Sequence, residues 1–147
     1  MMEIVQANLL DLNSLRRLEL DCFKQDAWSI LDLIAVLSFP EVVRLKAMVQ
    51  ARMVGFIAGD PRPREGWGWI ATIAVDPAFQ RRGIGSALLR ACEARLFVPK
   101  ARLTVRLSNV PAIAMYERDG YRTVDIWRNY YSDGEDAQVM EKVLAPG

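Results

Sequence analysis

The sequence has 147 residues, 52% of them hydrophobic and 25% charged, so it is long enough to fold as one domain with a buried core. Its formal net charge of +1, without a long run of basic residues, gives no support for a nucleic-acid partner. The lack of histidine excludes histidine-based triads and histidine-liganded metal sites, and we predict no metal. Neither a signal peptide nor a long apolar span is found, so we expect a cytoplasmic protein with no membrane partner.

A short strand and a helix are expected first. Residues 3–7 are β-rich, and Asp11 can cap a helix that runs to about Asp21. The inward face of this helix should carry Leu12, Leu15, Leu18 and Cys22. Both cysteines, Cys22 and Cys92, lie in amphipathic helical patterns, so we expect buried free thiols in a reducing compartment.

A second helix and a hairpin should follow. Ser29 begins a sequence like a capping box, which predicts a helix over residues 30–38. Residues 42–49 and 53–59 are β-rich and can pair as a hairpin, although residues 50–52 lack favourable turn chemistry.

The centre of the chain predicts an anion-binding turn. After a loop over residues 60–66, an apolar strand over 69–75 stops at an Asp-Pro pair, and a turn over 80–85 leads into an amphipathic helix. The N-terminus of such a helix offers backbone N–H groups and the positive end of the helix dipole. Gly83 and Gly85 would let a phosphate group approach the backbone closely, so we expect a phosphorylated ligand.

Two common phosphate-binding loops do not fit this turn. A Walker A loop requires a lysine at a spacing that this turn lacks. The dinucleotide fingerprint requires a third glycine, where the chain has Leu88. A plain strand-to-helix turn, with glycines for geometry and arginines for solubility, is the remaining alternative.

The last third of the chain predicts a strand, a helix and two more strands. Residues 102–107 alternate between apolar and polar, and the preceding helix should end ahead of Pro99. Asn109 can cap a helix that ends at Gly120. The last strands are expected at residues 121–127 and 137–144, joined by residues 128–136.

Three sequence blocks resemble the GNAT superfamily of acetyl-CoA-dependent N-acetyltransferases. Gln-Arg-Arg-Gly-Ile-Gly at 80–85, after Val-Asp-Pro, resembles its pyrophosphate-binding motif, and residues 103–121 resemble its block Asn-x-x-Ala-x-x-x-Tyr-x-x-x-Gly-Tyr/Phe. Arg-Asn-Tyr-Tyr at 128–131, followed by Gly-Glu-Asp-Ala at 134–137, resembles the RimI-type branch, which acetylates the N-terminal alanine of a small-subunit ribosomal protein. The resemblance covers roughly residues 53–144.

The resemblance implies a fold and a cosubstrate. We expect one α+β domain over residues 1–147 with the GNAT fold, in which about four helices flank a mixed, mostly antiparallel seven-stranded sheet with a splayed central strand pair. Acetyl-CoA would be the cosubstrate. Its pantetheine arm should pair with the backbone of Ile73, Ala74 and Val75. Its pyrophosphate should be held by Arg81, Arg82, Gly83, Ile84, Gly85 and Ser86.

The resemblance also assigns roles in the second half, each with a structural alternative. Asn109 matches an asparagine that contacts the cofactor, but it can also be a plain N-cap. Tyr116 matches the tyrosine that protonates the leaving thiolate, but a helical tyrosine is ordinarily core. Tyr130 and Tyr131 would line the acceptor groove, or they anchor the loop by apolar contact.

One position departs from the RimI pattern. Where that branch carries a glutamate as general base, this chain has Thr104, which cannot take the proton, so the base is not assigned. Glu19, Glu65 or Asp136 are the candidates for a base that acts through water. The leading hypothesis is acetyl transfer to a protein N-terminal amine by direct attack. The alternatives are a small-molecule amine acetyltransferase and a non-catalytic acetyl-CoA-binding module. The sequence leaves monomer and homodimer both open.

Overall fold

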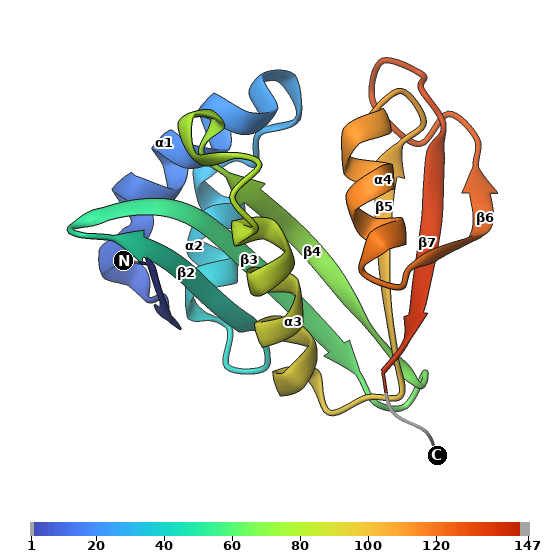
Figure 1. Cartoon of the computed structure of the whole chain (residues 1–147), viewed down its shortest axis with the longest axis horizontal. Coiled ribbons are helices and arrows are strands. Elements are labelled where there is room, and N and C mark those ends of the chain that lie inside the picture. The colour runs from blue at the N-terminus through green and yellow to red at the C-terminus, as the bar shows by residue number, and fades with distance from the viewer. Residues whose placement is uncertain (1, 145–147) are drawn as a thin grey trace. The chain divides into compact units, whose positions relative to one another are not determined.

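The computed structural model describes residues 2–144, and Figure 1 labels their helices and strands. The strands are β1 (Met2–Gln6), β2 (Val43–Val49), β3 (Arg52–Arg62), β4 (Trp67–Val75), β5 (Lys100–Arg106), β6 (Arg122–Trp127) and β7 (Ala137–Val143). The helices are α1 (Leu12–Phe23), α2 (Ile30–Ser38), α3 (Ile84–Leu96) and α4 (Val110–Arg118). Residues 1 and 145–147 of the expected domain lie outside the described residues.

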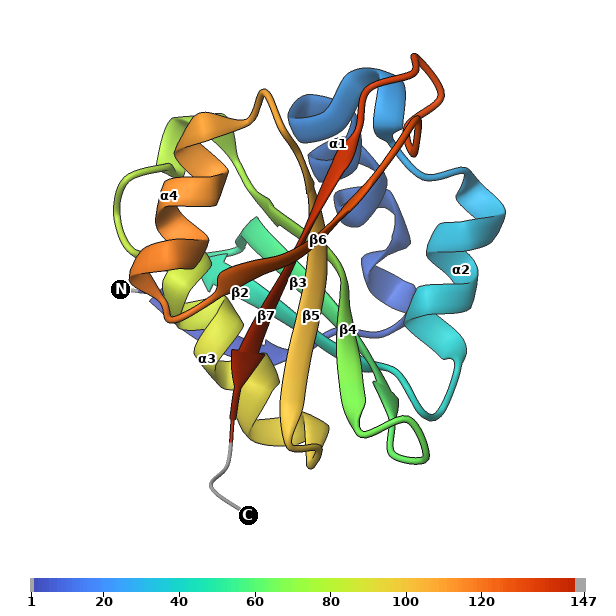
Figure 2. The same ribbon diagram turned by 90° about the vertical axis from the view of Figure 1, so that its right-hand side faces the viewer.

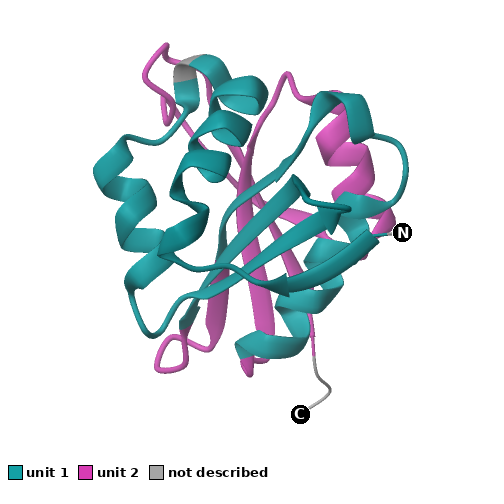
Figure 3. Cartoon of the chain, turned by 90° about the vertical axis from the view of Figure 1, so that its left-hand side faces the viewer, with its two compact units in different colours: residues 1–61, 70–96 teal, residues 62–69, 97–147 magenta. Residues whose placement is uncertain are grey.

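The chain divides into two units, coloured separately in Figure 3. Residues 1–61 and 70–96 form the first unit, and residues 62–69 and 97–147 form the second. The strand order is β1-β2-β3-β4-β5-β7-β6, in a seven-stranded sheet. The expected fold class is confirmed: the sheet is mixed, and four helices accompany it.

The first unit is a four-stranded layer with helices on both faces. Helices α1 and α2 cover one face of β1–β4 and α3 covers the other (Figure 2). The face under α1 and α2 holds an apolar core that includes Leu15, Leu18, Leu33, Phe56 and Ala74. On the other face α3 comes very close to β3, because Gly55 and Gly59 have no Cβ: one added at Gly59 would lie 2.7 Å from Cys92 Sγ.

The second unit joins the start of β4 to the C-terminal strands. β4 and β5 are parallel, and their register runs from Trp67↔Lys100 to Trp69↔Arg102, a short pairing of the kind expected for a splayed pair. β5 and β6 both pair with β7 in antiparallel fashion. The side chains of β5 alternate, with Ala101, Leu103 and Val105 buried on one face.

The helix starts confirm two expected caps and correct a third. Ser29 accepts a hydrogen bond from the Asp32 backbone N–H, and Asn109 accepts one from the N–H of Ala112. The prediction that Asp11 caps α1 was wrong, because its side chain makes no capping bond to that helix. Asn8 and Asp11 instead form a capping box around the preceding 3₁₀ turn, Leu9–Asp11.

Candidate functional site

The end of β4 is shaped by Asp76. Its carboxylate accepts hydrogen bonds from the backbone N–H of Ala78 at 2.9 Å and from Nη2 of Arg52 at 2.8 Å. The bond from Arg52 is the largest influence lowering the pKa of Asp76, although burial opposes it. Asp76 therefore stays ionised and caps the 3₁₀ turn Pro77–Phe79, which redirects the chain toward α3.

The turn that follows is exposed at Arg81–Gly83 and leads into α3, whose first residues, Ile84 and Gly85, are buried. Arg81 and Gly83 have left-handed backbone conformations, with φ of 65° and 80°. A Cβ at Gly83 would meet nothing within 4 Å, so glycine is required there by its conformation. The hydrogen bonding of α3 begins where the N–H of Ala87 donates to the Gly83 carbonyl at 3.0 Å. The N-terminus of a 13-residue helix, beside the exposed Arg81 and Arg82, can hold an anion.

The last residues of β4 are tied to α1. The thiol of Cys22 donates a hydrogen bond to the Val75 carbonyl at 3.3 Å, and Nε2 of Gln80 donates to the same oxygen at 3.2 Å. Three residues before Cys22 on α1, Glu19 is 1% exposed and accepts a hydrogen bond from the Thr72 hydroxyl at 3.0 Å. Two side chains of α1 therefore contact β4, one at each end of residues 72–75.

In the second unit, Tyr116 is a buried side chain of α4. It is 7% exposed, and its ring contacts that of Tyr121 edge-on with centroids 6.1 Å apart. Burial first, and then the neighbouring Tyr131, raise the pKa of its hydroxyl. The hydroxyl is therefore neutral at physiological pH and can donate a proton or a hydrogen bond.

A row of aromatic side chains crosses one face of this unit. Trp69 and Trp127 lie 5.6 Å apart, Trp127 and Tyr130 5.5 Å, and Tyr130 and Tyr131 5.0 Å, between ring centroids. Trp69 is on β4 and Trp127 on β6, with β5 and β7 between them, so their strands are about 14 Å apart. The two indoles must therefore lean toward each other over β5 and β7.

Thr104 lies on the face that the indoles cover. Trp69 is in register with Arg102, and Trp127 with Ala137, which pairs with Arg106. Thr104 lies two residues from each of these arginines on β5, so its side chain is on the same face of the sheet as theirs. Thr104 itself is partly exposed on this face.

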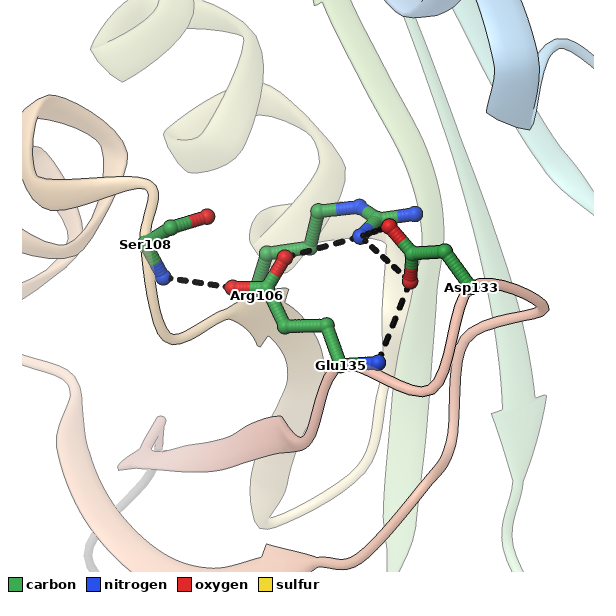
Figure 4. A network of polar contacts seen from close by, with 4 residues as sticks. All are labelled: Arg106, Ser108, Asp133 and Glu135. Carbon is green, nitrogen blue, oxygen red and sulfur yellow. Dashed lines mark hydrogen bonds and ion pairs between the residues drawn. The ribbon is translucent and has the colours of Figure 1, made fainter.

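Arg106 holds the loop between β6 and β7 (Figure 4). Its Nη1 donates to Asp133 at 2.9 Å and to Glu135 at 2.8 Å, and its guanidinium lies 4.2 Å from the ring centroid of Tyr131. The second oxygen of Glu135 accepts the backbone N–H of Ser108 at 2.8 Å. Because Ser108 precedes Asn109, one network fixes both the tyrosine-bearing loop and the start of α4.

Both carboxylates of this network are held in the ionised form. The backbone N–H of Glu135, followed by Arg106, lowers the pKa of Asp133, and Ser108 and Arg106 lower the pKa of Glu135. The sequence singled out neither Arg106 nor the indole pair. The Arg106 network joins residues 27 and 29 positions apart, so local patterns could not reveal it.

The residues expected from the sequence fall into two groups. The first unit holds most of those expected to bind the cofactor, namely Ile73, Ala74, Val75, Arg81, Arg82, Gly83, Ile84, Gly85 and Ser86. The second unit holds Asn109, which is also expected to contact the cofactor, together with Tyr116, Tyr130 and Tyr131. Their roles remain predictions. Within residues 2–144, no helix is long and apolar enough to cross a membrane, and no group of three or more acidic, cysteine or histidine side chains could hold a metal.

Comparison with known proteins gives consistent matches. The acetyltransferase (GNAT) family matches residues 12–121. An N-alpha-acetyltransferase of Sulfurisphaera tokodaii is 38% identical over 116 residues, which cover 67% of each chain. The [ribosomal protein bS18]-alanine N-acetyltransferase of Escherichia coli is 49% identical over 74 residues, covering 46% of this chain and 50% of the relative. The crystal structure of the ribosomal-protein-S18-alanine N-acetyltransferase from Escherichia coli has a TM-score of 0.89 at 29% identity, covering 100% of this chain and 96% of that one.

Proposed function

The chain belongs to the acetyltransferase (GNAT) family, and on that premise we propose that it transfers an acetyl group from acetyl-CoA to the α-amine of a protein N-terminus. The observation that carries the acceptor class is the likeness, along the whole chain, to an enzyme named for acetylating the alanine of a ribosomal protein. The relative from Sulfurisphaera tokodaii, named for N-alpha acetylation, supports the same class.

The first unit offers the groups that would bind the cosubstrate. The N-terminus of α3, with Arg81 and Arg82 beside it, fits a pyrophosphate, because backbone N–H groups and arginines both favour phosphate oxygens. Ile73 to Val75 would pair with the pantetheine arm through their backbone. The Val75 carbonyl already accepts two hydrogen bonds from side chains, so other backbone groups of this segment would carry the pairing. Acetyl-CoA supplies the activated thioester.

The second unit offers a proton donor and an acceptor surface. Tyr116 would donate its proton to the leaving sulfur, which its neutral, buried hydroxyl suits. Asn109 would contact the cofactor while capping α4. Tyr130 and Tyr131 would line the acceptor groove, in a loop that Arg106 holds in place.

Thr104 stands where the RimI-type branch carries a general-base glutamate, and this substitution affects which amine the protein can use as acceptor. An α-amine has a pKa of about 7.7–8.0, so on the order of a tenth is already neutral at pH 7. A lysine side chain, with a pKa of about 10.4, is neutral only about 0.04% of the time. Deprotonating a lysine side chain therefore costs roughly 3.4 kcal/mol more than deprotonating an α-amine. A weak base, or one that acts through water, therefore suits an N-terminal amine better than a lysine.

The decisive experiment measures acetyl-CoA turnover by the purified protein with three acceptors. These are a peptide that begins with alanine, the same peptide blocked at its N-terminus but containing lysine, and a panel of small amines. We expect acetylation of the free N-terminus alone. Higher kcat/KM for a small amine would replace the proposed acceptor, and bound acetyl-CoA without turnover on any acceptor would make the protein a binding module.

The domain organisation, the cellular location and the oligomeric state are also proposals. We propose that residues 1–147 act as a single domain, although residues 1 and 145–147 lie outside those that the structure describes. A cytoplasmic location, and the choice between monomer and homodimer, likewise rest on the sequence and on the acceptor class.

A further inference from the structure

Glu19 is a buried carboxyl group with an incomplete set of hydrogen bonds. It lies on the inner face of α1 and is 1% exposed. One oxygen, Oε2, accepts the Thr72 hydroxyl at 3.0 Å. The other oxygen, Oε1, is buried and has no hydrogen-bond partner among residues 2–144. Buried polar atoms without partners are rare in folded proteins, so Oε1 calls for a functional explanation.

The place of Glu19 in the first unit is also specific. Thr72 directly precedes Ile73, the first residue of the segment expected to pair with the pantetheine arm. One helical turn after Glu19, Cys22 contacts Val75 at the other end of that segment. α1 therefore presents a carboxyl group beside the stretch of β4 at which the pantetheine arm is expected.

We propose that Glu19 is the proton acceptor of the reaction, working through a water molecule hydrogen-bonded to Oε1, in the role that Thr104 cannot fill. This inference rests on the proposed function, because it presumes an amine that must lose a proton before it attacks the acetyl group. Oε1 is the atom that would receive the proton, since Oε2 already accepts the hydroxyl of Thr72.

The structure separates Glu19 from the other two carboxyl candidates. Glu65 is exposed in the turn between β3 and β4. Asp136 accepts Nη1 of Arg128 at 3.1 Å and the backbone N–H of Asn129 at 2.9 Å, so its oxygens serve to hold the loop. Glu19 alone of the three combines burial with an oxygen that has no partner.

The surroundings of Glu19 make its carboxylate a stronger base than an exposed glutamate. Burial raises the pKa of Glu19, while the hydroxyl of Thr72 and the nearby backbone N–H of Trp28, which makes no hydrogen bond to Oε1, lower it to a smaller extent. Its titratable neighbour on α1 is Cys22, which also feels the charges of Asp21 and Asp76. α2 packs on α1 with apolar side chains (Leu33, Val36 and Leu37), and Asp76 beyond β4 is paired with Arg52.

The proton balance of the step is simple. The ammonium form of the acceptor gives one proton to the water, which passes one to Oε1 of Glu19. The neutral amine nitrogen forms the new bond to the acetyl carbon, and the carbon–sulfur bond breaks. The thiolate takes its proton from Tyr116. The nitrogen loses its second proton to solvent as the amide forms, Tyr116 regains a proton from solvent, and Glu19 returns its own proton to solvent before the next turnover.

The first test compares Glu19→Gln with Glu65→Gln, which removes an equal charge from an exposed site. Glutamine keeps the shape of Glu19 and can still accept the Thr72 hydroxyl, but it cannot take a proton. We expect Glu19→Gln to lower kcat/KM for the alanine peptide by about 10²-fold or more, with an unchanged KM for acetyl-CoA. Glu65→Gln should match the wild type. An unchanged kcat/KM and pH profile in Glu19→Gln would overturn the proposal.

The second test moves the pKa of Glu19 without removing the residue. Thr72→Val deletes the hydroxyl that lowers this pKa, so the acid limb of the kcat/KM profile should move to higher pH. Thr72→Ser keeps a hydroxyl and should restore the wild-type limb. A peptide whose α-amine has a different pKa should move only the part of the pH profile that reports ionisation of the acceptor. The part that does not move is then assigned to Glu19.

These outcomes separate the two proposals. If Glu19→Gln fails to fold, as judged by its thermal transition, an unmoved acid limb in Thr72→Val overturns the role of Glu19. If the wild type acetylates small amines but no peptide, the proposed acceptor is wrong, and the same pH profiles are measured on the amine that reacts.

Discussion

Tyr116 is a helical tyrosine whose burial keeps its hydroxyl protonated, with a raised pKa. If it protonates the leaving thiolate, Tyr116→Phe removes that proton and little else, because the ring still fills its place against Tyr121. We expect kcat to fall by tenfold or more, about 1.4 kcal/mol or above, while the Kd for acetyl-CoA stays the same. Steady-state kinetics and calorimetric titration measure the two quantities. An unchanged kcat would remove Tyr116 from the mechanism.

The raised pKa of Glu19 has a consequence for stability that is independent of activity. Below its ordinary pKa of 4.5, the carboxyl is protonated in both the folded and unfolded chain. As pH rises from there through the higher folded pKa, the unfolded chain ionises first, so the free energy of unfolding falls. Glu19→Gln escapes this loss, and its stability relative to the wild type should increase as the pH rises above 4.5. Urea unfolding at several pH values measures the difference, and a constant difference would contradict the raised pKa.

At the scale of elements, the close approach of α3 to β3 positions the N-terminus of that helix. In Gly59→Ala the new methyl group would lie 2.7 Å from Cys92 Sγ and 2.9 Å from Leu96 Cδ2. α3 must then shift, so we expect a loss of about 1–3 kcal/mol in the free energy of unfolding and weaker binding of acetyl-CoA. The pair Gly59→Ala with Cys92→Ala provides the control, since removing the sulfur should recover part of both losses. Additive losses in the double variant would contradict the steric cause.

Elements specified by neighbouring residues could be predicted from the sequence. The strand, the Asp-Pro stop, the glycine turn and the start of α3 are encoded within about twenty residues, and the cap at Asn109 within four. The predicted end of β3 was wrong. A loop was expected from residue 60, but the strand continues to Arg62 in spite of two prolines nearby.

Features that depend on distant residues were missed for a common reason. Asp11 suits an N-cap by local rules, yet it binds Nζ of Lys46, a residue 35 positions away, and Asn8 takes the capping role. Glu19 lies four residues after Leu15 and three before Cys22, on the inward stripe of α1, but its partner Thr72 is 53 positions away and no local pattern identifies it. Hydrophobic periodicity describes which face is buried and does not show which polar residue that face contains.

At the scale of the whole molecule, the chain passes between its two units at residues 61–62, 69–70 and 96–97, and β4 contributes to both. We therefore expect one cooperative thermal transition. Acetyl-CoA at one hundred times its Kd should stabilise the folded chain by about 2.7 kcal/mol. For a chain of this size, the midpoint should rise by roughly 5–10 °C.

Scanning calorimetry with and without ligand tests both expectations. Pantetheine, which lacks the pyrophosphate, serves as the matched ligand and should give a much smaller rise. Two separate transitions would contradict the single domain. An equal rise with pantetheine would contradict the role of the turn at Arg81–Ser86.

The hydrogen bond from Cys22 to Val75 has a chemical consequence for an enzyme that handles a thioester. A thiolate beside the acetyl-carrying arm could capture the acetyl group for itself. Burial is the first cause that raises the pKa of Cys22 to about 11, and it raises that of Cys92 to about 12. At pH 8 only about one Cys22 side chain in a thousand is nucleophilic. We therefore expect little S-acetylation of the protein itself, and thiol-reactive dyes should report released CoA with little background from the folded protein.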